Sequence, residues 1–125
     1  MCKAFEMYQA SDLFRKAYSY AVGNYDYVSI LSARYGLLLP DEVIEPYELT
    51  LYSMNNEEQR RWAERVFDQM ENKLPIDQIS EVIFHAGSVY RKHLVKLLQG
   101  HGISCRSPLD GLGIGKQKAW YLRHS

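Results

Sequence analysis

The sequence predicts an α/β fold: residues 1–125 as a single small three-layer domain, with a mostly parallel central sheet of three to four strands and helices on both faces. Short runs rich in β-branched and aromatic residues alternate with longer segments whose apolar residues recur at helical spacing. This alternation implies right-handed crossovers, which place parallel strands side by side under two layers of helices. The length of 125 residues fits one domain with its own core.

The predicted elements follow one another without an internal repeat or a linker. Ser11 is a good N-cap for a first helix that ends at Gly23-Asn24. Asn55 or Asn56 caps the next helix, with Trp62 on its core side, and Pro75 stops it. Short strands are expected at 27–32, 79–84 and 103–107, a helix capped by Ser88 between the last two strands, and a final helix at 116–122.

The segment 32–51 is the part of the chain around which the rest is organised. The first strand should end near Ala33-Arg34, and Gly36 allows a sharp turn because glycine tolerates positive φ. Residues just past the carboxyl end of a strand face the ligand crevice of an open α/β sheet, so Arg34 and Tyr35 are expected at a binding site. The alternative is a solvated connection that packs its leucines onto the core.

The segment 84–88 reads as a strand–turn–helix junction. Free N–H groups at a helix start, with Gly87 allowing close approach, make an anion site. Ser88 is expected either to cap the helix or to bind a ligand oxygen, and Arg91 could hold a phosphate with its fork of donors. His85 is either a buried structural histidine or a catalytic base.

A second anion site is predicted at the glycine-rich segment 111–115. Its spacing matches neither a dinucleotide-binding motif nor a P-loop, but bare backbone N–H groups beside Lys116 form a nest for anions. The alternative is a flexible turn. Asp110 precedes this segment and is one of two acidic residues in positions 81–125.

The formal net charge of zero hides an asymmetry along the chain. Residues 1–80 carry 13 acidic and 8 basic side chains, whereas residues 81–125 carry 2 and 7. Anionic partners are therefore expected against the C-terminal third, with solvated helix faces as the alternative. Cys2 and Cys105 lack metal-ligand spacing and are expected as reduced thiols in a cytoplasmic protein. No signal peptide, membrane span, metal or cofactor is expected.

Three motifs resemble the signature of a bacterial, archaeal and phage domain family of unknown function. They are SARYGLLLPDEVIEPYELTL at 32–51, FHAGSVYR at 84–91 and PLDGLGIG at 108–115, and together they cover nearly the whole chain. Many members begin with a strand and a Cys-Ser-type loop, whereas this chain starts close to its first helix, so that first strand is expected to be absent. The resemblance implies no activity, but a distant kinship with α/β domains that act on nucleobases and nucleosides.

The leading hypothesis is binding of a nucleotide, nucleoside or nucleic-acid base, with cleavage or exchange of an N-glycosidic bond as the reaction. That reaction needs a negative group near the oxocarbenium-like centre and an acid near the leaving group. Asp41, Glu45 and Asp110 are candidates for the first role. The second role falls to Arg34, His85 or Tyr47. The expected binding residues are Arg34, Tyr35, Tyr47, Gly87, Ser88, Tyr90, Arg91, Gly113 and Lys116.

The alternative hypothesis is a non-enzymatic protein-binding module, such as a phage or mobile-element factor that acts on a host protein. The chain contains 10 tyrosines, which suit both base stacking and protein interfaces. Polar groups gathered in one concave site would favour the ligand, and polar groups scattered over a flat face would favour the protein partner.

Overall fold

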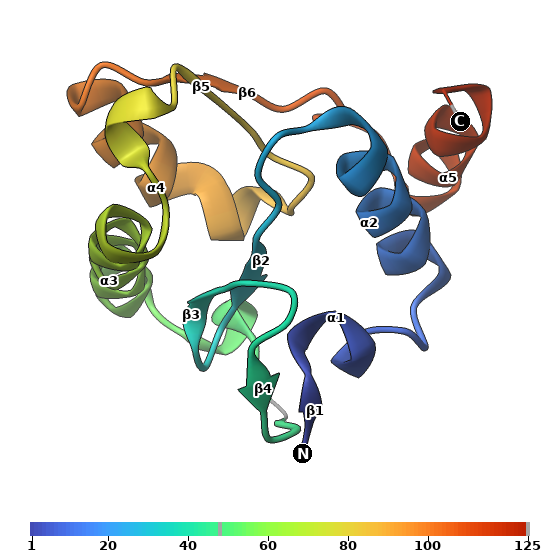
Figure 1. Cartoon of the computed structure of the whole chain (residues 1–125), viewed down its shortest axis with the longest axis horizontal. Helices are drawn as coiled ribbons and strands as arrows, with labels where there is room; N and C mark the ends of the chain where they lie inside the picture. The colour runs from blue at the N-terminus through green and yellow to red at the C-terminus, as the bar shows by residue number, and fades with distance from the viewer. Residues whose placement is uncertain (48, 125) are drawn as a thin grey trace. The chain divides into compact units, whose positions relative to one another are not determined.

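The computed structural model describes residues 1–47 and 49–124, so Glu48 of the motif at 32–51 lies outside the described residues. The chain forms two compact units. Unit 1 contains Met1–Ile30, Leu38–Pro46 and Leu109–Ser125, and unit 2 contains Leu31–Leu37 and Tyr47–Pro108. Each unit is thus assembled from segments that are distant in the sequence (Figure 1).

The predicted fold class is wrong, because the described strands form no central parallel sheet. They form three two-stranded sheets: β1 (Cys2–Lys3) with β4 (Val43–Ile44), β2 (Ile30–Ser32) with β3 (Gly36–Leu38), and β5 (Glu81–Ile83) with β6 (Ser104–Arg106). The β1–β4 pair is antiparallel and the β5–β6 pair is parallel. The strand expected to join the parallel sheet instead pairs with the strand that immediately follows it. So short a connection can join only antiparallel strands, and the result is a hairpin.

Unit 2 is built on two helices that pack side by side, α3 (Asn56–Lys73) and α4 (Ser88–Gly100) (Figure 1). Helix α4 is the crossover between β5 and β6, so the predicted β–α–β arrangement does exist, reduced to two strands. The 3-10 turns η1 (Leu51–Ser53) and η2 (Ile76–Gln78) flank α3. The core of this unit consists of Ala33, Leu37, Leu51, Trp62, Ala63, Val66, Met70, Ile76, Phe84, Leu94, Leu98 and Ile103.

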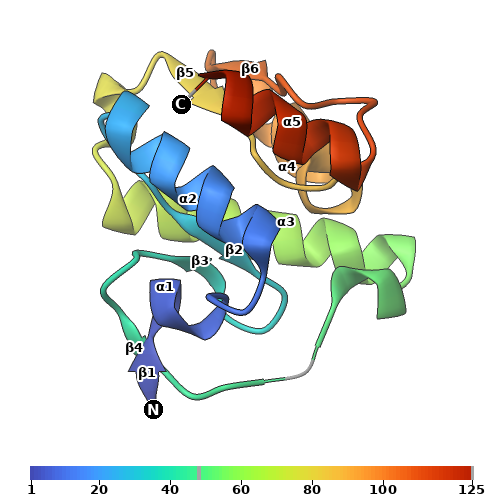
Figure 2. The same cartoon turned by 90° about the vertical axis from the view of Figure 1, so that its right-hand side faces the viewer.

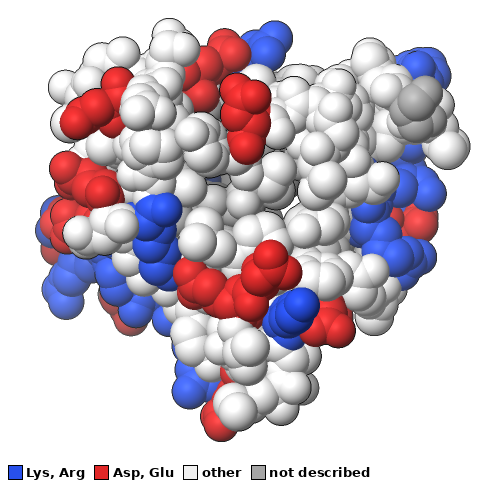
Figure 3. Space-filling model, in the orientation of Figure 1, with Lys and Arg blue, Asp and Glu red and all other residues white. Residues whose placement is uncertain are grey.

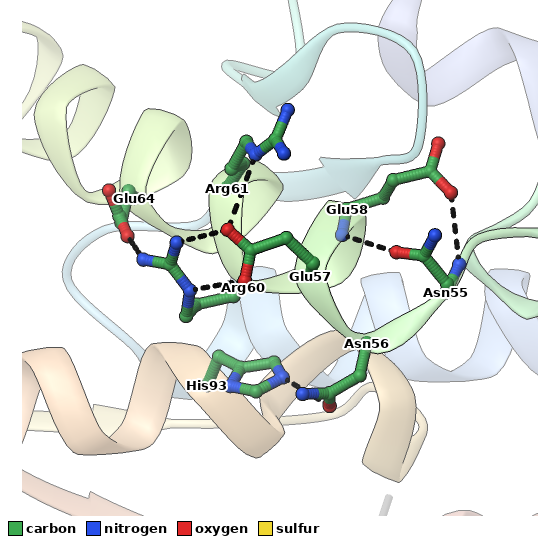
Figure 4. Close-up of polar contacts among 8 residues, drawn as sticks. All are labelled: Asn55, Asn56, Glu57, Glu58, Arg60, Arg61, Glu64 and His93. Carbon is green, nitrogen blue, oxygen red and sulfur yellow. Dashed lines mark hydrogen bonds and ion pairs between the residues drawn. The ribbon is translucent and has the colours of Figure 1, made fainter.

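The start of α3 confirms the predicted cap at Asn55. The side chain of Asn55 accepts the Glu58 N–H at 2.8 Å, and the Glu58 carboxylate accepts the Asn55 N–H at 3.1 Å (Figure 4). The helix ends at Lys73, just before Pro75, as predicted. Along the exposed face Arg60 bonds to the carboxylates of Glu57 and Glu64, which makes this surface mixed in charge.

Unit 1 contains the helices α1 (Ala4–Met7), α2 (Asp12–Asn24) and α5 (Ile114–His124). Ser11 caps α2 as predicted, since its hydroxyl accepts the Phe14 N–H at 3.1 Å. Figure 2 shows α2 and α5 side by side, and the Tyr20 ring contacts the Trp120 ring at 5.0 Å between centroids. The short strand β1 precedes α1 in this unit.

Two predictions concern the cysteines and the hydrophobicity of the helices. Cys2 and Cys105 are both free thiols, as predicted. Across residues 1–47 and 49–124, every helix is too short or too polar to cross a membrane.

One row of α3 side chains hydrogen-bonds the backbone of the turn at 32–37. The Gln69 amide donates to the Tyr35 carbonyl at 2.9 Å and accepts the Leu37 N–H at 2.7 Å. These two bonds span Gly36, whose φ is 80°. The other donors of the row are Trp62 Nε1 to the Ser32 carbonyl at 2.9 Å, Arg65 to the Arg34 carbonyl at 2.8 Å and Lys73 to the Leu37 carbonyl at 2.8 Å. Their spacing of three or four residues puts all four side chains on one side of α3.

We call these hydrogen bonds between α3 and the turn at 32–37 the clamp, and alanine at position 36 tests it. A Cβ on Gly36 would lie 2.1 Å from Gln69 Oε1. We expect Gly36→Ala to lower the free energy of unfolding by more than about 2 kcal/mol, because left-handed backbone alone costs a residue with a Cβ about 1–2 kcal/mol. Urea denaturation measures the change.

Gly102→Ala is the matched control, since Gly102 has a φ of 85° and no atom within 4 Å of its added Cβ. In this variant the free energy of unfolding should fall only by the backbone cost of about 1–2 kcal/mol. In a Gln69→Ala background the excess cost of Gly36→Ala should vanish, and its persistence there would contradict the clamp.

Candidate functional site

Ser32 is the buried anchor of the candidate site in unit 2. Its side chain is fully buried, and its hydroxyl accepts the Tyr35 N–H at 3.0 Å. The same hydroxyl donates to the Tyr47 hydroxyl at 2.9 Å. A buried hydroxyl with partners on both sides holds them in one geometry, since losing either bond leaves a desolvated polar group. Ser32 therefore ties the segment at Tyr47 to the turn.

Four aromatic rings and one guanidinium gather around this anchor. The rings of Tyr35 and Tyr47 meet edge to face, with centroids 5.8 Å apart, and the Arg34 guanidinium lies 5.1 Å from the Tyr35 centroid. Trp62, whose Nε1 donates to the Ser32 carbonyl, contacts the Tyr90 ring with centroids 5.7 Å apart. We call these six residues the turn cluster: Ser32, Arg34, Tyr35, Tyr47, Trp62 and Tyr90. Four of the predicted binding residues thus belong to one structural cluster.

The turn cluster is partly open to solvent. Arg34 is exposed, and Tyr35 and Tyr47 are half-buried, whereas Trp62 is buried. Arginine over a tyrosine ring is a cation–π arrangement that also serves planar ligands, because both groups present flat faces. The cluster can therefore offer a ligand one flat aromatic face and one positive charge.

The start of α4 differs from its prediction at one residue. Gly87, not Ser88, occupies the N-cap position, so the predicted Ser88 cap is wrong. Glycine lacks a side chain with which to cap, so the N-cap residue supplies no side-chain hydrogen bond to this helix end. Ser88 is exposed, and the exposed Tyr52 has its hydroxyl near Gly87. Uncapped N–H groups and the helix dipole favour an anion here.

His85 and Arg91 flank this helix start in the sequence, and both are partly buried. Burial lowers the pKa of His85 below its ordinary value, because an imidazolium loses hydration there. His85 is therefore neutral at pH 7 and can accept or donate one hydrogen bond. Arg91 keeps its charge, and its Nε atom is inaccessible to solvent.

The remaining predicted residues belong to unit 1. Asp41 is 84% exposed and lies 3.8 Å from the Lys3 ammonium, which is a solvated ion pair rather than a pocket. Glu45 and Asp110 are exposed. Gly113 is exposed and directly precedes α5, and Lys116 lies exposed in its first turn.

The open parallel sheet that was expected to place Arg34 and Tyr35 at a ligand crevice is absent from the described residues. Strand β2 pairs with β3 and not with β5 or β6, so the segments that carry Arg34 and His85 do not follow strands of one sheet. The segment 111–115 is also shorter as a loop than expected, because α5 begins at Ile114. Within the described residues no three His, Cys, Asp or Glu side chains lie close enough together to hold a metal ion.

The structure adds functional candidates that the sequence reading missed. Ser32 was expected only as the end of a strand, and Gln69 was given no role. Tyr52 is 73% exposed in η1, beside the start of α4. The sequence signal for an exposed aromatic residue here was the position of Tyr52 between Thr50 and Ser53, because serine and threonine favour turns.

The fold and the site define a class of protein: a small mixed helical and β-hairpin domain that carries an arginine–tyrosine cluster on a clamped turn. A family model described as a family of unknown function, DUF6884, matches residues 1–123, and the chain belongs to that family. No curated protein and no solved structure matches the chain.

Replacing Ser32 tests its role as anchor. Ser32→Ala removes the acceptor of the Tyr35 N–H and the donor to Tyr47, so we expect it to cost about 1–3 kcal/mol of unfolding free energy. Tyr47→Phe removes the second bond and leaves the Tyr35 N–H bond to Ser32 in place, so it should cost about 1 kcal/mol. Chemical denaturation of both variants compares them, and equal losses would show that Ser32 does not hold the turn.

The pKa of His85 gives a second prediction. Its folded pKa lies below the unfolded value of 6.5, so the unfolded chain binds more protons between the two values. The stability contributed by neutral His85 is therefore complete above pH 6.5 and declines as pH falls through the folded pKa. His85→Gln should flatten this decline in a pH series of melting curves, and His101→Gln, which changes an exposed histidine, should leave it intact.

Proposed function

We propose that this is a cytoplasmic domain that binds a nucleotide, nucleoside or nucleic-acid base through unit 2. The turn cluster receives the base, and the uncapped start of α4 receives the phosphate. The observation that carries the proposal is the arrangement of Arg34, Tyr35 and Tyr47, held on a turn whose backbone is hydrogen-bonded by α3. Two free thiols agree with a reducing compartment.

The base subsite rests on stacking. Tyr35 and Tyr47 are half-buried, so each ring is fixed by its neighbours but keeps some accessible surface. An unpaired base stacks on aromatic rings and on the plane of an arginine, and each such stack contributes about 1–3 kcal/mol. Arg34 adds donors for base edges or for a phosphate.

The phosphate subsite rests on α4. The helix has 13 residues and an N-cap that provides no side-chain bond. The Tyr90 N–H bonds to the Gly87 carbonyl, so the N–H groups of Ser88 and Val89 would hold the oxyanion. Lys92 is exposed in the second turn and adds a full positive charge on the same helix. Ser88 can donate its hydroxyl to a phosphate oxygen, because it is not used as a cap.

Cleavage or exchange of an N-glycosidic bond is the reaction that we propose for such a ligand. His85, neutral at pH 7, would polarise the leaving base through its N–H. The reaction also needs a carboxylate near the oxocarbenium-like centre. The acids expected in that role, Asp41, Glu45 and Asp110, belong to unit 1 and not to unit 2.

A protein-binding role is the second candidate, and one observation favours it. Leu49 and Tyr52 are 44% and 73% exposed, which places two large apolar side chains at or beside η1. Tyrosine is enriched in protein interfaces. In this alternative the chain is a phage or mobile-element factor that docks on a host protein.

Thermal shift at low salt separates the two functions. We expect nucleoside monophosphates to raise the melting temperature more than inorganic phosphate does, because only they engage both subsites. At about 100 times the dissociation constant the stabilisation should be about 2.7 kcal/mol. In Arg34→Ala, nucleoside monophosphates should raise the melting temperature no more than inorganic phosphate does. In Arg91→Ala, both ligands should raise it less than they do in wild type.

Lys96→Ala is the control, since it removes an exposed charge from a later turn of α4. It should respond to the ligands as wild type does. Equal shifts in wild type, Arg34→Ala and Arg91→Ala would exclude the proposed subsites and favour protein binding.

A further inference from the structure

Helix α5 presents a basic and aromatic stripe in unit 1. Lys116, Trp120, Arg123 and His124 follow the spacing i, i+4, i+7 and i+8, which places them on one side of a helix. The helix contains no acidic residue between Ile114 and His124. The stripe spans about 12 Å along the axis at 1.5 Å per residue.

The neighbouring side of α5 packs on α2, and the Trp120 ring at the edge of the stripe also contacts Tyr20 of α2, with centroids 5.0 Å apart. Tyr121 is buried, and its ring lies 5.9 Å from the Tyr20 ring. Lys118 lies 3.4 Å from the Asp12 carboxylate, which also pairs with Lys16. The hydrogen bonds from Lys16 and Lys118 lower the pKa of Asp12. The packing therefore fixes which side of α5 faces outward.

The charges of the stripe are exposed and available. Lys116 and Arg123 are exposed, and neither forms an ion pair with another described residue. Figure 3 shows basic side chains gathered over α2 and α5 at the right-hand edge. An unneutralised pair of cations attracts a polyanion and releases its counterions on association.

The aromatic part of the stripe is a pair of stacked rings. The rings of Trp120 and His124 lie 3.9 Å apart with planes inclined by 16°. The His124 Nδ1 is 2.7 Å from the Trp120 carbonyl, which fixes the imidazole on the indole. His124 is exposed, so its outer face can receive another flat ring.

We infer that this stripe binds single-stranded nucleic acid, with Lys116 and Arg123 on phosphates and the Trp120–His124 pair under an unpaired base. Cations interleaved with aromatic rings are the arrangement that binds single strands with little sequence preference. A duplex keeps its bases stacked inside and cannot use the ring pair. The inference is independent of the proposed function, because all four residues belong to unit 1.

The test is fluorescence anisotropy of the full chain with a labelled single-stranded DNA of about 16 nucleotides, the upper end of common site sizes. The double variant Lys116→Gln/Arg123→Gln should bind more weakly and lower the slope of log K against log salt by about 0.7 for each phosphate that it no longer neutralises. His124→Ala should weaken binding roughly tenfold because the base loses its stacking partner, with the slope unchanged.

Arg61→Gln/Lys96→Gln is the matched control, because it removes the same charge from exposed positions of unit 2 outside the proposed subsites. The control should keep the affinity and the salt slope of wild type. Lys116→Arg/Arg123→Lys, which keeps both charges, should also bind with the affinity and slope of wild type. Equal loss in the control, equal binding of duplex DNA, or no binding by wild type would overturn the inference. None of these outcomes depends on mononucleotide binding by unit 2.

Discussion

The structure of unit 2 depends on one side-chain amide. Gln69 satisfies the Tyr35 carbonyl and the Leu37 N–H, two backbone groups that lie on either side of Gly36. Backbone groups withdrawn from water need partners, and a hairpin of two three-residue strands supplies few of its own. Helix α3 supplies the rest through Trp62 and neighbouring polar side chains. The turn is therefore held by tertiary contacts and not by its local sequence alone.

The same clamp explains how a short turn can carry a site. Once the turn backbone is fixed, Arg34 and Tyr35 have few orientations to lose on binding, and the entropic cost of ordering them for a ligand is smaller. Ser32 extends the effect to Tyr47 through its buried hydroxyl. Buried residues of the motif thus position Arg34 and two half-buried tyrosines. On the proposed function, packing would account for the first group and binding for the second.

Local signals in the sequence predicted local structure well. Ser11 and Asn55 were identified as caps because their effect is confined to one helical turn, and Pro75 as a stop for the same reason. The predicted central sheet failed because strand pairing is decided by distant partners. Gly36 was identified as a turn residue, but the leucines after it were interpreted as a loop and not as the returning strand β3. The Gln69–Leu37 bond joins residues 32 positions apart, which no periodicity reveals.

Amide hydrogen exchange at Leu37 tests the central claim most directly. In wild type this N–H should exchange slowly, because Gln69 accepts it at 2.7 Å. In Gln69→Ala it should exchange much faster, while the Ser104 N–H, bonded to the Ser80 carbonyl in the β5–β6 region, should keep its protection. Rapid exchange of Leu37 in wild type, or protection unchanged in the variant, would contradict the account of the clamped turn.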